Sequence, residues 1–267
     1  ITNFSQQSSE ISYVNGPPVI LISSAGSVGI TLQQGYKIGQ FFGFKLMKSL
    51  DELNPLTGLP MIPEASRNLY EVVNTTVGGN WVVNKATRQA VALPGQSSLG
   101  DPNPKFNMSF INNLQYKNTL TFSMQWDWIA GAHLYNQTKQ WMYRDGIHSD
   151  YDMPVTINGE TQAFTSFYRS MYAGGAANGT KNYFYEDASF WRLRNLSVGV
   201  DIAKLTKIKF ANRLQLVLSG RNLLTFTPYS GMDPEVNYST NSAFDRGLDH
   251  NTIPNTKSYT VGLNVGF

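Results

Sequence analysis

The stretch NTLTFSMQWDW, from Asn118 to Trp128, alternates strictly between two kinds of side chain. The even positions after Asn118 are apolar and the odd positions are polar: apolar Leu120, Phe122, Met124, Trp126 and Trp128, and polar Thr119, Thr121, Ser123, Gln125 and Asp127. Because successive side chains of a β-strand point to opposite faces of the sheet, this alternation predicts a strand with one apolar and one polar face. Its length exceeds the roughly 5–6 residues usual in soluble sheets and suits a tilted crossing of a bilayer.

Other stretches show the same alternation. The long ones are Tyr36–Leu46, Phe106–Tyr116 and the final Ser258–Phe267. A shorter one runs from Leu214 to Leu218. The alternation from Trp191 to Val200 changes phase near Asn195, where we expect a β-bulge.

The remaining local signals are weaker. Lys117 and Asn118 separate two of the strands and predict a tight hairpin. Thr138–Arg144 is the short helix that we expect, and glycine and proline punctuate most connections. Further strand candidates lie before Tyr36: Ile11–Val14, Val19–Ile22 and Ser27–Gln33. The sequence therefore predicts an all-β fold.

The connections between the long strands are alternately long and short. The long ones cover residues 46–105, 130–188 and 225–256, and the short ones cover 117–118 and 202–212. Outer-membrane barrels alternate in this way, because their periplasmic turns are short and their extracellular loops are long. The pattern predicts strands of an antiparallel transmembrane β-barrel with the C-terminus on the periplasmic side. We expect ligands to bind at the long loops.

The composition agrees with this interpretation. Only 15% of the residues are charged, well below the share of about 25% in soluble domains. The net charge of +3 is scattered along the chain, so we expect no nucleic-acid partner. The longest apolar run, Pro17 to Ala25, is too short for a transmembrane helix. The chain begins without Met or a signal peptide, so we expect a processed protein or a portion of a longer one.

Five stretches carry a resemblance to a known family. They are GYKIGQFFGFK (Gly35–Lys45), LGDPNPKF (Leu99–Phe106), YEDASFWRLRNLS (Tyr185–Ser197), SGRNLLTFTPYSGMDPEV (Ser219–Val236) and the closing PNTKSYTVGLNVGF (Pro254–Phe267). In this order they resemble motifs of the SusC/RagA-type TonB-dependent outer-membrane transporters. The chain departs from the family pattern at Lys37, where Pro is frequent, at Arg221, which replaces Gln, and at Lys257, which replaces Arg.

The resemblance implies a place in a larger fold. Residues 1–267 would form one unit, the C-terminal part of a large barrel of about 22 strands. The plug domain and the N-terminal strands of the family are absent from this chain. The resemblance further implies active import of oligosaccharides or peptides across the cell outer membrane, energised by TonB through those absent parts.

The resemblance also implies partners. A SusD-like surface lipoprotein would cap the barrel, and lipid and lipopolysaccharide would surround it. The outer-membrane assembly machinery would read an aromatic C-terminal signal. Its residues here are Tyr259, Val261, Leu263, Val265 and Phe267.

No pattern of catalytic or metal-binding residues stands out. The three histidines fall in long connections without ligand spacing: His133, His148 and His250. The acidic residues near His148 suit a solvated loop better than a metal site: Asp145, Asp150 and Asp152. We therefore expect no enzyme activity, no cofactor and no bound metal.

The aromatic residues have two interpretations. Trp126 and Trp128, near a strand end, suit a girdle at the membrane interface. Residues of the longest loop could pack the loop or contact a partner, or they could stack on a sugar or bind a peptide. These candidates for contact with substrate or lid are Trp141, Tyr143, Arg144, Tyr151, Phe167, Tyr168 and Tyr172.

Two other classes of protein stay open on the residue patterns alone. One is a secreted, soluble, carbohydrate-binding β-sandwich, which strand length and loop alternation disfavour. The other is a small, self-contained outer-membrane barrel with a structural or adhesive role, which the family motifs disfavour.

Overall fold

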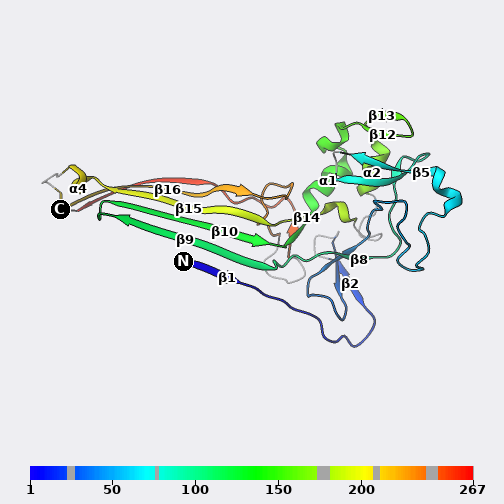
Figure 1. The fold of residues 1–267 in the computed structure, drawn as a ribbon, viewed down its shortest axis with the longest axis horizontal. Helices are drawn as coiled ribbons and strands as arrows, with labels where there is room; N and C mark the ends of the chain where they lie inside the picture. Colours follow the sequence, from blue (N-terminus) through cyan, green and yellow to red (C-terminus); the bar gives the residue numbers. More distant parts are fainter. Residues whose placement is uncertain (23–27, 76–77, 173–180, 207–210, 239–245, 267) are drawn as a thin grey trace.

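The structure, a computed structural model, describes residues 1–22, 28–75, 78–172, 181–206, 211–238 and 246–266. Figure 1 shows two regions end to end along the longest axis of the molecule. One is a narrow sheet of long strands. The other, which we call the loop region, contains short strands and helices and is built from the long connections between those strands.

The narrow sheet has six antiparallel strands in the order β1-β9-β10-β15-β16-β18. Their bounds are β1 Thr2–Ser5, β9 Phe106–Tyr116, β10 Leu120–Ala130, β15 Phe190–Asp201, β16 Arg213–Phe226 and β18 Ser258–Gly266. The predicted all-β class and long antiparallel strands are confirmed. The short edge strand β1 was not predicted from the sequence.

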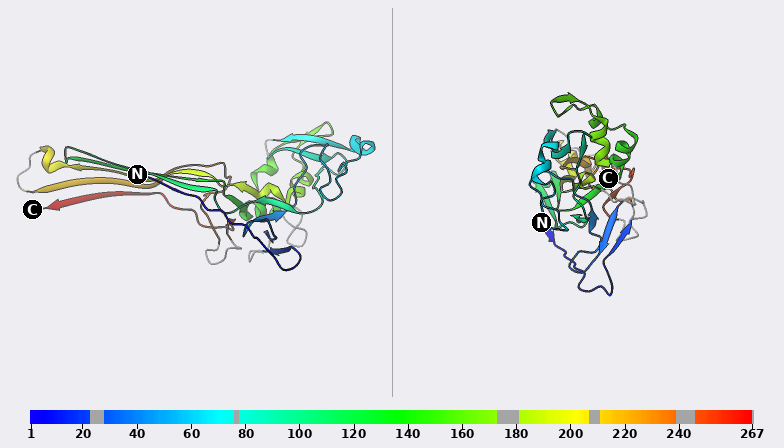
Figure 2. Two further views of the ribbon diagram at one scale, coloured as in Figure 1. Left: turned by 60° about the horizontal axis from the view of Figure 1, so that its bottom comes forward. Right: turned by 90° about the vertical axis from the view of Figure 1, so that its right-hand side faces the viewer.

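The short connections lie together at the end of the sheet away from the loop region (Figures 1 and 2). Lys117 and Asn118 both have positive φ, 47° and 53°, as a two-residue type I′ hairpin requires. The helix α4 (Ile202–Thr206) lies in the short connection between β15 and β16. The predicted bulge is confirmed at Arg194, because Gln125 pairs with Asn195 and Trp126 pairs with Leu193.

The register of the sheet separates apolar from polar side chains. One row across the strands is wholly apolar: Leu114, Phe122, Val198, Leu218 and Val261. The next row is wholly polar: Asn113, Ser123, Ser197, Ser219 and Thr260. Since neighbouring rows point to opposite faces, the sheet has one apolar face and one polar face.

The loop region contains several small sheets and short helices. One sheet has the order β2-β3-β4-β8, with β2 Val19–Ile22, β3 Gly29–Leu32, β4 Phe41–Gly43 and β8 Ser97–Gly100. A second comprises β5 Tyr70–Thr75, β6 Gly79–Asn84 and β7 Gln89–Ala90. A third has the order β14-β11-β17, with β14 Tyr185–Asp187, β11 His133–Asn136 and β17 Leu248–Asp249. A hairpin pairs β12 Val155–Ile157 with β13 Glu160–Gln162. Among the described residues of this region, α1 covers Gln137–Asp145 and α2 covers Thr165–Tyr172.

The predicted short helix is confirmed by α1. Asn136 caps its start by accepting a hydrogen bond from the backbone N–H of Lys139, and Gly146 ends it in the left-handed conformation. None of the helices among the described residues is long and apolar enough to cross a membrane.

The predicted long strand over Tyr36–Leu46 is wrong. Only Phe41–Gly43 forms a strand there, and it belongs to the loop region. Gly35 and Gly39 have φ of 82° and 81°, which interrupts an extended chain. Both parities of β4 are buried, so its apolar residues fill a core rather than cover a face.

The weaker strand predictions before Tyr36 had mixed outcomes. Val19–Ile22 is confirmed as β2, whereas Ile11–Val14 forms no strand. Within Ser27–Gln33, β3 covers Gly29–Leu32, and Ser27 lies outside the described residues.

The main hydrophobic core lies in the loop region. Its largest fully buried side chains include Tyr135, Tyr143, Tyr168, Phe41, Phe167 and Phe184. Aromatic rings of this size bury much apolar surface each and stabilise a region that has little regular structure. The loop region is therefore a folded unit that can hold side chains in fixed positions.

Candidate functional site

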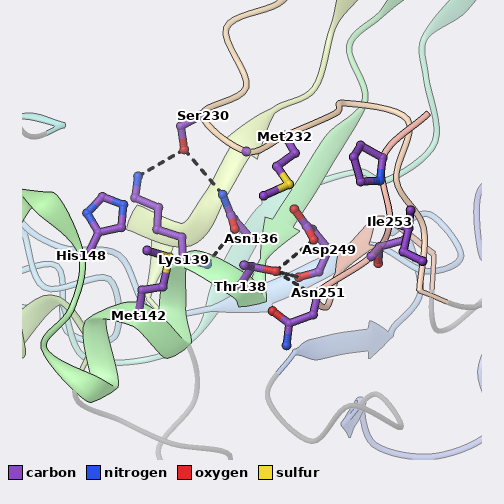
Figure 3. Close-up of a pocket in the computed structure, with 13 residues that line it drawn as sticks. Asn136, Thr138, Lys139, Met142, His148, Ser230, Met232, Asp249, Asn251 and Ile253 are labelled. Atoms are coloured by element: carbon purple, nitrogen blue, oxygen red, sulfur yellow. Dashed lines mark hydrogen bonds between the residues drawn. The ribbon is translucent and has the colours of Figure 1, made fainter. Parts of the chain in front are cut away.

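A cavity of about 570 Å³ lies between α1 and the last long connection, residues 227–257. Figure 3 shows its walls. One wall consists of Asn136, Thr138, Lys139, Met142 and His148, and the other of residues 230–232, Asp249 and residues 251–254. Two segments that lie about 90 residues apart in the sequence thus form one site.

Polar groups of the cavity are held by Glu186. Lys139 Nζ lies 3.2 Å from Glu186 Oε1, and both side chains are largely buried. The backbone N–H and the hydroxyl of Ser230 each donate a hydrogen bond of 2.8 Å to the same carboxylate. The amide of Asn136 lies 3.5 Å from the Ser230 hydroxyl. These contacts fix the donors at this side of the cavity, and Figure 3 shows the bonds of Ser230 with Asn136 and Lys139.

A second set of hydrogen bonds surrounds Asp249. Thr138 donates its hydroxyl hydrogen to Asp249 Oδ1 over 3.0 Å and accepts one from the backbone N–H of Asn251 over 2.8 Å. The Tyr229 hydroxyl donates to Asp249 Oδ2 over 2.6 Å. Burial, reinforced by this hydrogen bond, raises the pKa of Tyr229 well above its usual range. Tyr229 therefore stays neutral and keeps the proton that it donates to Asp249.

A second cavity of about 460 Å³ shares Lys139 with the first. Its lining adds charged and aromatic residues: Lys45, Lys48, Trp81, Tyr183, Glu186 and Asp187. Lys139 Nζ lies 4.4 Å from the centre of the Tyr183 ring, and Lys48 Nζ lies 5.5 Å from that of Trp81, as in cation–π contacts. The Lys139–Glu186 pair is thus adjacent to both cavities.

The loop residues predicted as contacts do not line either cavity. Tyr143, Phe167 and Tyr168 are fully buried in the core, so they pack the loop region. The Tyr143 hydroxyl donates to Asp150, and so does that of Tyr183, over 2.9 Å. Burial raises the pKa of Tyr143 far above its usual range and that of Tyr168 to about 12.

The other candidates lie nearer the surface. Arg144 pairs with Asp145 over 2.7 Å and stacks on Trp141, whose ring edge contacts His250. The Tyr151 hydroxyl donates to the Tyr143 carbonyl over 2.7 Å, and Tyr172 packs against the core.

The cavity residues were missed because tertiary structure alone brings the two walls together. The one local signal that the sequence offers here is Asn136 as a helix cap, which would predict a helix start but not a site. Among the described residues, no group of three or more His, Asp or Glu side chains is placed to hold a metal ion.

The predicted assembly signal lies in β18. Tyr259, Val261, Leu263 and Val265 share the exposed apolar face of that strand, and Phe267 lies outside the described residues. Trp126 and Trp128 lie near the loop-region end of β10, on its apolar face.

These features define a class of protein: a two-faced sheet of long antiparallel strands whose extended connections fold into a cap with cavities. No family model matches the chain. It is 30% identical over 241 residues to TonB-dependent receptor P3 of Formosa agariphila, covering 88% of this chain and 23% of that receptor. It is 27% identical over 272 residues to TonB-dependent receptor P39 of the same organism, covering 90% and 26%.

Solved structures agree with these relatives. The structure of the RagAB peptide transporter matches all of this chain and 27% of its own, with a TM-score of 0.57 at 16% identity. The RagAB peptide importer in its "open-open" state matches with a TM-score of 0.53. The predicted resemblance to SusC/RagA-type TonB-dependent transporters is confirmed, in sequence by the receptors and in fold by RagAB. The chain spans about a quarter of the length of the curated relatives it matches.

Proposed function

We propose that this chain supplies part of the wall and of the outer loops of an outer-membrane transporter that imports oligosaccharides or peptides. The observation that carries the proposal is the pair of rows across the sheet. A row of Leu114, Phe122, Val198, Leu218 and Val261 would be costly against water but suits lipid. The polar row beside it suits a hydrated lumen.

The orientation follows from the same proposal. The short connections would face the periplasm and the loop region would face the outside, so β18 would end at the periplasmic rim. TonB would act through parts that this chain does not contain. A SusD-like lipoprotein would cover the loop region. The outer-membrane assembly machinery would recognise β18, and lipopolysaccharide would contact the outer part of the apolar face.

The cavity between α1 and residues 230–254 is our candidate for substrate contact. Met232 and Ile253 on its rim are 83% and 87% exposed, which leaves apolar surface for a ligand. Asn136, Lys139 and Ser230 offer polar groups that are already oriented. A substrate that enters this cavity would contact the lysine shared by both cavities.

Uptake by the full-length protein tests this function. Lys139→Met should reduce uptake of the native substrate, whereas Lys117→Met, in the hairpin at the far end of the sheet, should leave it unchanged. Both variants should retain heat-modifiable gel mobility, a sign of an intact barrel. Uptake that persists without TonB, or partition of the protein with soluble proteins, would contradict the proposal.

A further inference from the structure

Two arginines of β15 hold the last long connection against the sheet. Arg192 Nη2 lies 2.6 Å from Asp233 Oδ1, and its Nη1 lies 2.5 Å from Glu235 Oε2. Arg194 binds the same Glu235 through Nη2 at 2.7 Å and binds Asp127 of β10 through Nε at 2.8 Å. We call Arg192, Arg194, Asp233 and Glu235 the arginine clamp.

The burial of the clamp shows that it is not a surface ion pair. The side chains of Arg192 and Asp233 are only 3% and 4% exposed. Surface pairs of this type contribute little, but removing one partner of a buried pair leaves the other charge without compensation. The contacts of Arg192 with two carboxylates at once supply that compensation.

The β-bulge of β15 lies within the part of the strand that carries the clamp. Arg194 is the extra residue between Leu193 and Asn195, and the chain changes parity there. Arg192 and Arg194, two residues apart, both reach the polar face, where Asp127 and Glu235 lie. A regular strand would continue the alternation that begins at Arg192 and would turn Asn195 away from Gln125, which it now contacts at 3.4 Å.

The clamp anchors both segments of one cavity wall. Asp233 follows directly after the lining residues 230–232, and Asn255 follows directly after 251–254. The backbone N–H of Asn255 donates to Asp233 Oδ2 over 2.9 Å, and its amide donates to Glu235 Oε2 over 3.2 Å. One buried group of charges thus joins the ends of the two segments to each other and to the sheet.

We infer that Arg192 and Arg194 are positioning residues that set the distance between the two walls of the substrate cavity. That the cavity holds a substrate rests on the proposed function. The part of the inference that concerns the distance between the walls does not. α1 forms the opposite wall and is held through Asn136 and Lys139. With the clamp intact the walls stand at a fixed distance. Without it, the two segments lose their common anchor on the sheet and keep the weaker contacts of Ser230 with Glu186 and of Asp249 with Thr138 and Tyr229.

A distance measurement tests the inference without knowledge of the substrate. Residues 1–267 contain no cysteine, so in a full-length protein freed of any cysteine elsewhere, Met142→Cys and Ile253→Cys would place one spin label on each wall. In the full-length protein in detergent we expect a narrow distance distribution. Arg192→Met should broaden it, Arg192→Lys should restore much of the narrow component, and Arg221→Met, an exposed arginine of β16, should change nothing.

Glu235→Gln provides a second test in case Arg192→Met prevents folding. This milder change retains the size of the side chain, so the protein should still insert, and the distribution should broaden less than with Arg192→Met. A narrow distribution in both Arg192→Met and Glu235→Gln would overturn the inference. If the protein without these substitutions imports neither oligosaccharides nor peptides, the proposed function is refuted, but the inference about the wall distance is not.

Discussion

The sheet and the loop region place their apolar side chains in opposite ways. Val261 in the sheet is 73% exposed, whereas Tyr143 in the loop region is fully buried. The loop region folds around a buried aromatic core, as a soluble domain does. The sheet does the reverse on one face. The difference indicates two solvents, because a face with this much exposed apolar surface is stable only against lipid or another apolar partner.

Replacing a phenylalanine with alanine should change the free energy of unfolding most, and most unequally, when the two regions are compared. Phe41→Ala removes a ring that is fully buried in the core of the loop region and should cost about 3–5 kcal/mol. Phe4→Ala, in β1 of the sheet, removes a ring that is 57% exposed and should cost much less. Chemical unfolding followed by limited proteolysis of the loop region would measure both. Equal losses would show that the loop region has no core of its own.

Arginine on the two rows of the sheet should separate them next most strongly. Phe122→Arg puts a charge on the apolar row and should cost about 2–4 kcal/mol if that row lies at mid-bilayer. Ser123→Arg, one residue further on, lies on the polar row and should be mild. Refolding into lipid vesicles would compare the two. If both positions tolerate arginine equally, the membrane-facing assignment fails.

Asp150 tests the polar contacts inside the loop region. Burial alone would raise its pKa, but hydrogen bonds with His148, Tyr143 and Tyr183 outweigh burial and hold the pKa well below the usual range. The stabilisation is therefore complete above the ordinary value near 3.9 and is lost only as the pH falls through the lowered pKa.

Asp150→Asn should then destabilise the loop region at neutral pH by about 1–3 kcal/mol, because two buried hydroxyls lose a charged acceptor. Its acid unfolding should also become less steep. Asp145→Asn is the matched control, since that carboxylate is exposed and pairs only with its neighbour Arg144. Circular dichroism at several pH values would measure both. An equal response of the two variants would contradict the role of Asp150.

The hairpin at Lys117 and Asn118 should show the smallest effect. Asn118 has φ of +53°, so Asn118→Val should cost about 1–2 kcal/mol, whereas Asn118→Gly should be tolerated. Refolding yield of the barrel would report the difference. A neutral effect of valine would show that the turn adopts another conformation.

Period-two alternation predicted the sheet well because each of its faces meets one environment. For Leu120–Ala130 the pattern of side chains specified the strand, its faces and its hairpin partner. The bulge near Asn195 was visible as a change of phase for the same reason.

The loop region was less predictable from the sequence. Tyr36–Leu46 shows the same alternation, but its rings enter a core from both sides of a short strand, and parity has no meaning there. The cavity was also out of reach. Lys139 and Ser230 share one carboxylate across about 90 residues of sequence, a proximity that only the folded chain creates.

The most direct test of the account compares two neighbouring residues of β18 in the membrane. Spin labels at Val261→Cys and Thr260→Cys in the reconstituted full-length protein would report access to oxygen, which dissolves in lipid, and to a water-soluble nickel complex. If the apolar row faces lipid, the label at position 261 should meet oxygen and not nickel, and the label at position 260 should show the opposite preference. The same preference at both positions would contradict it.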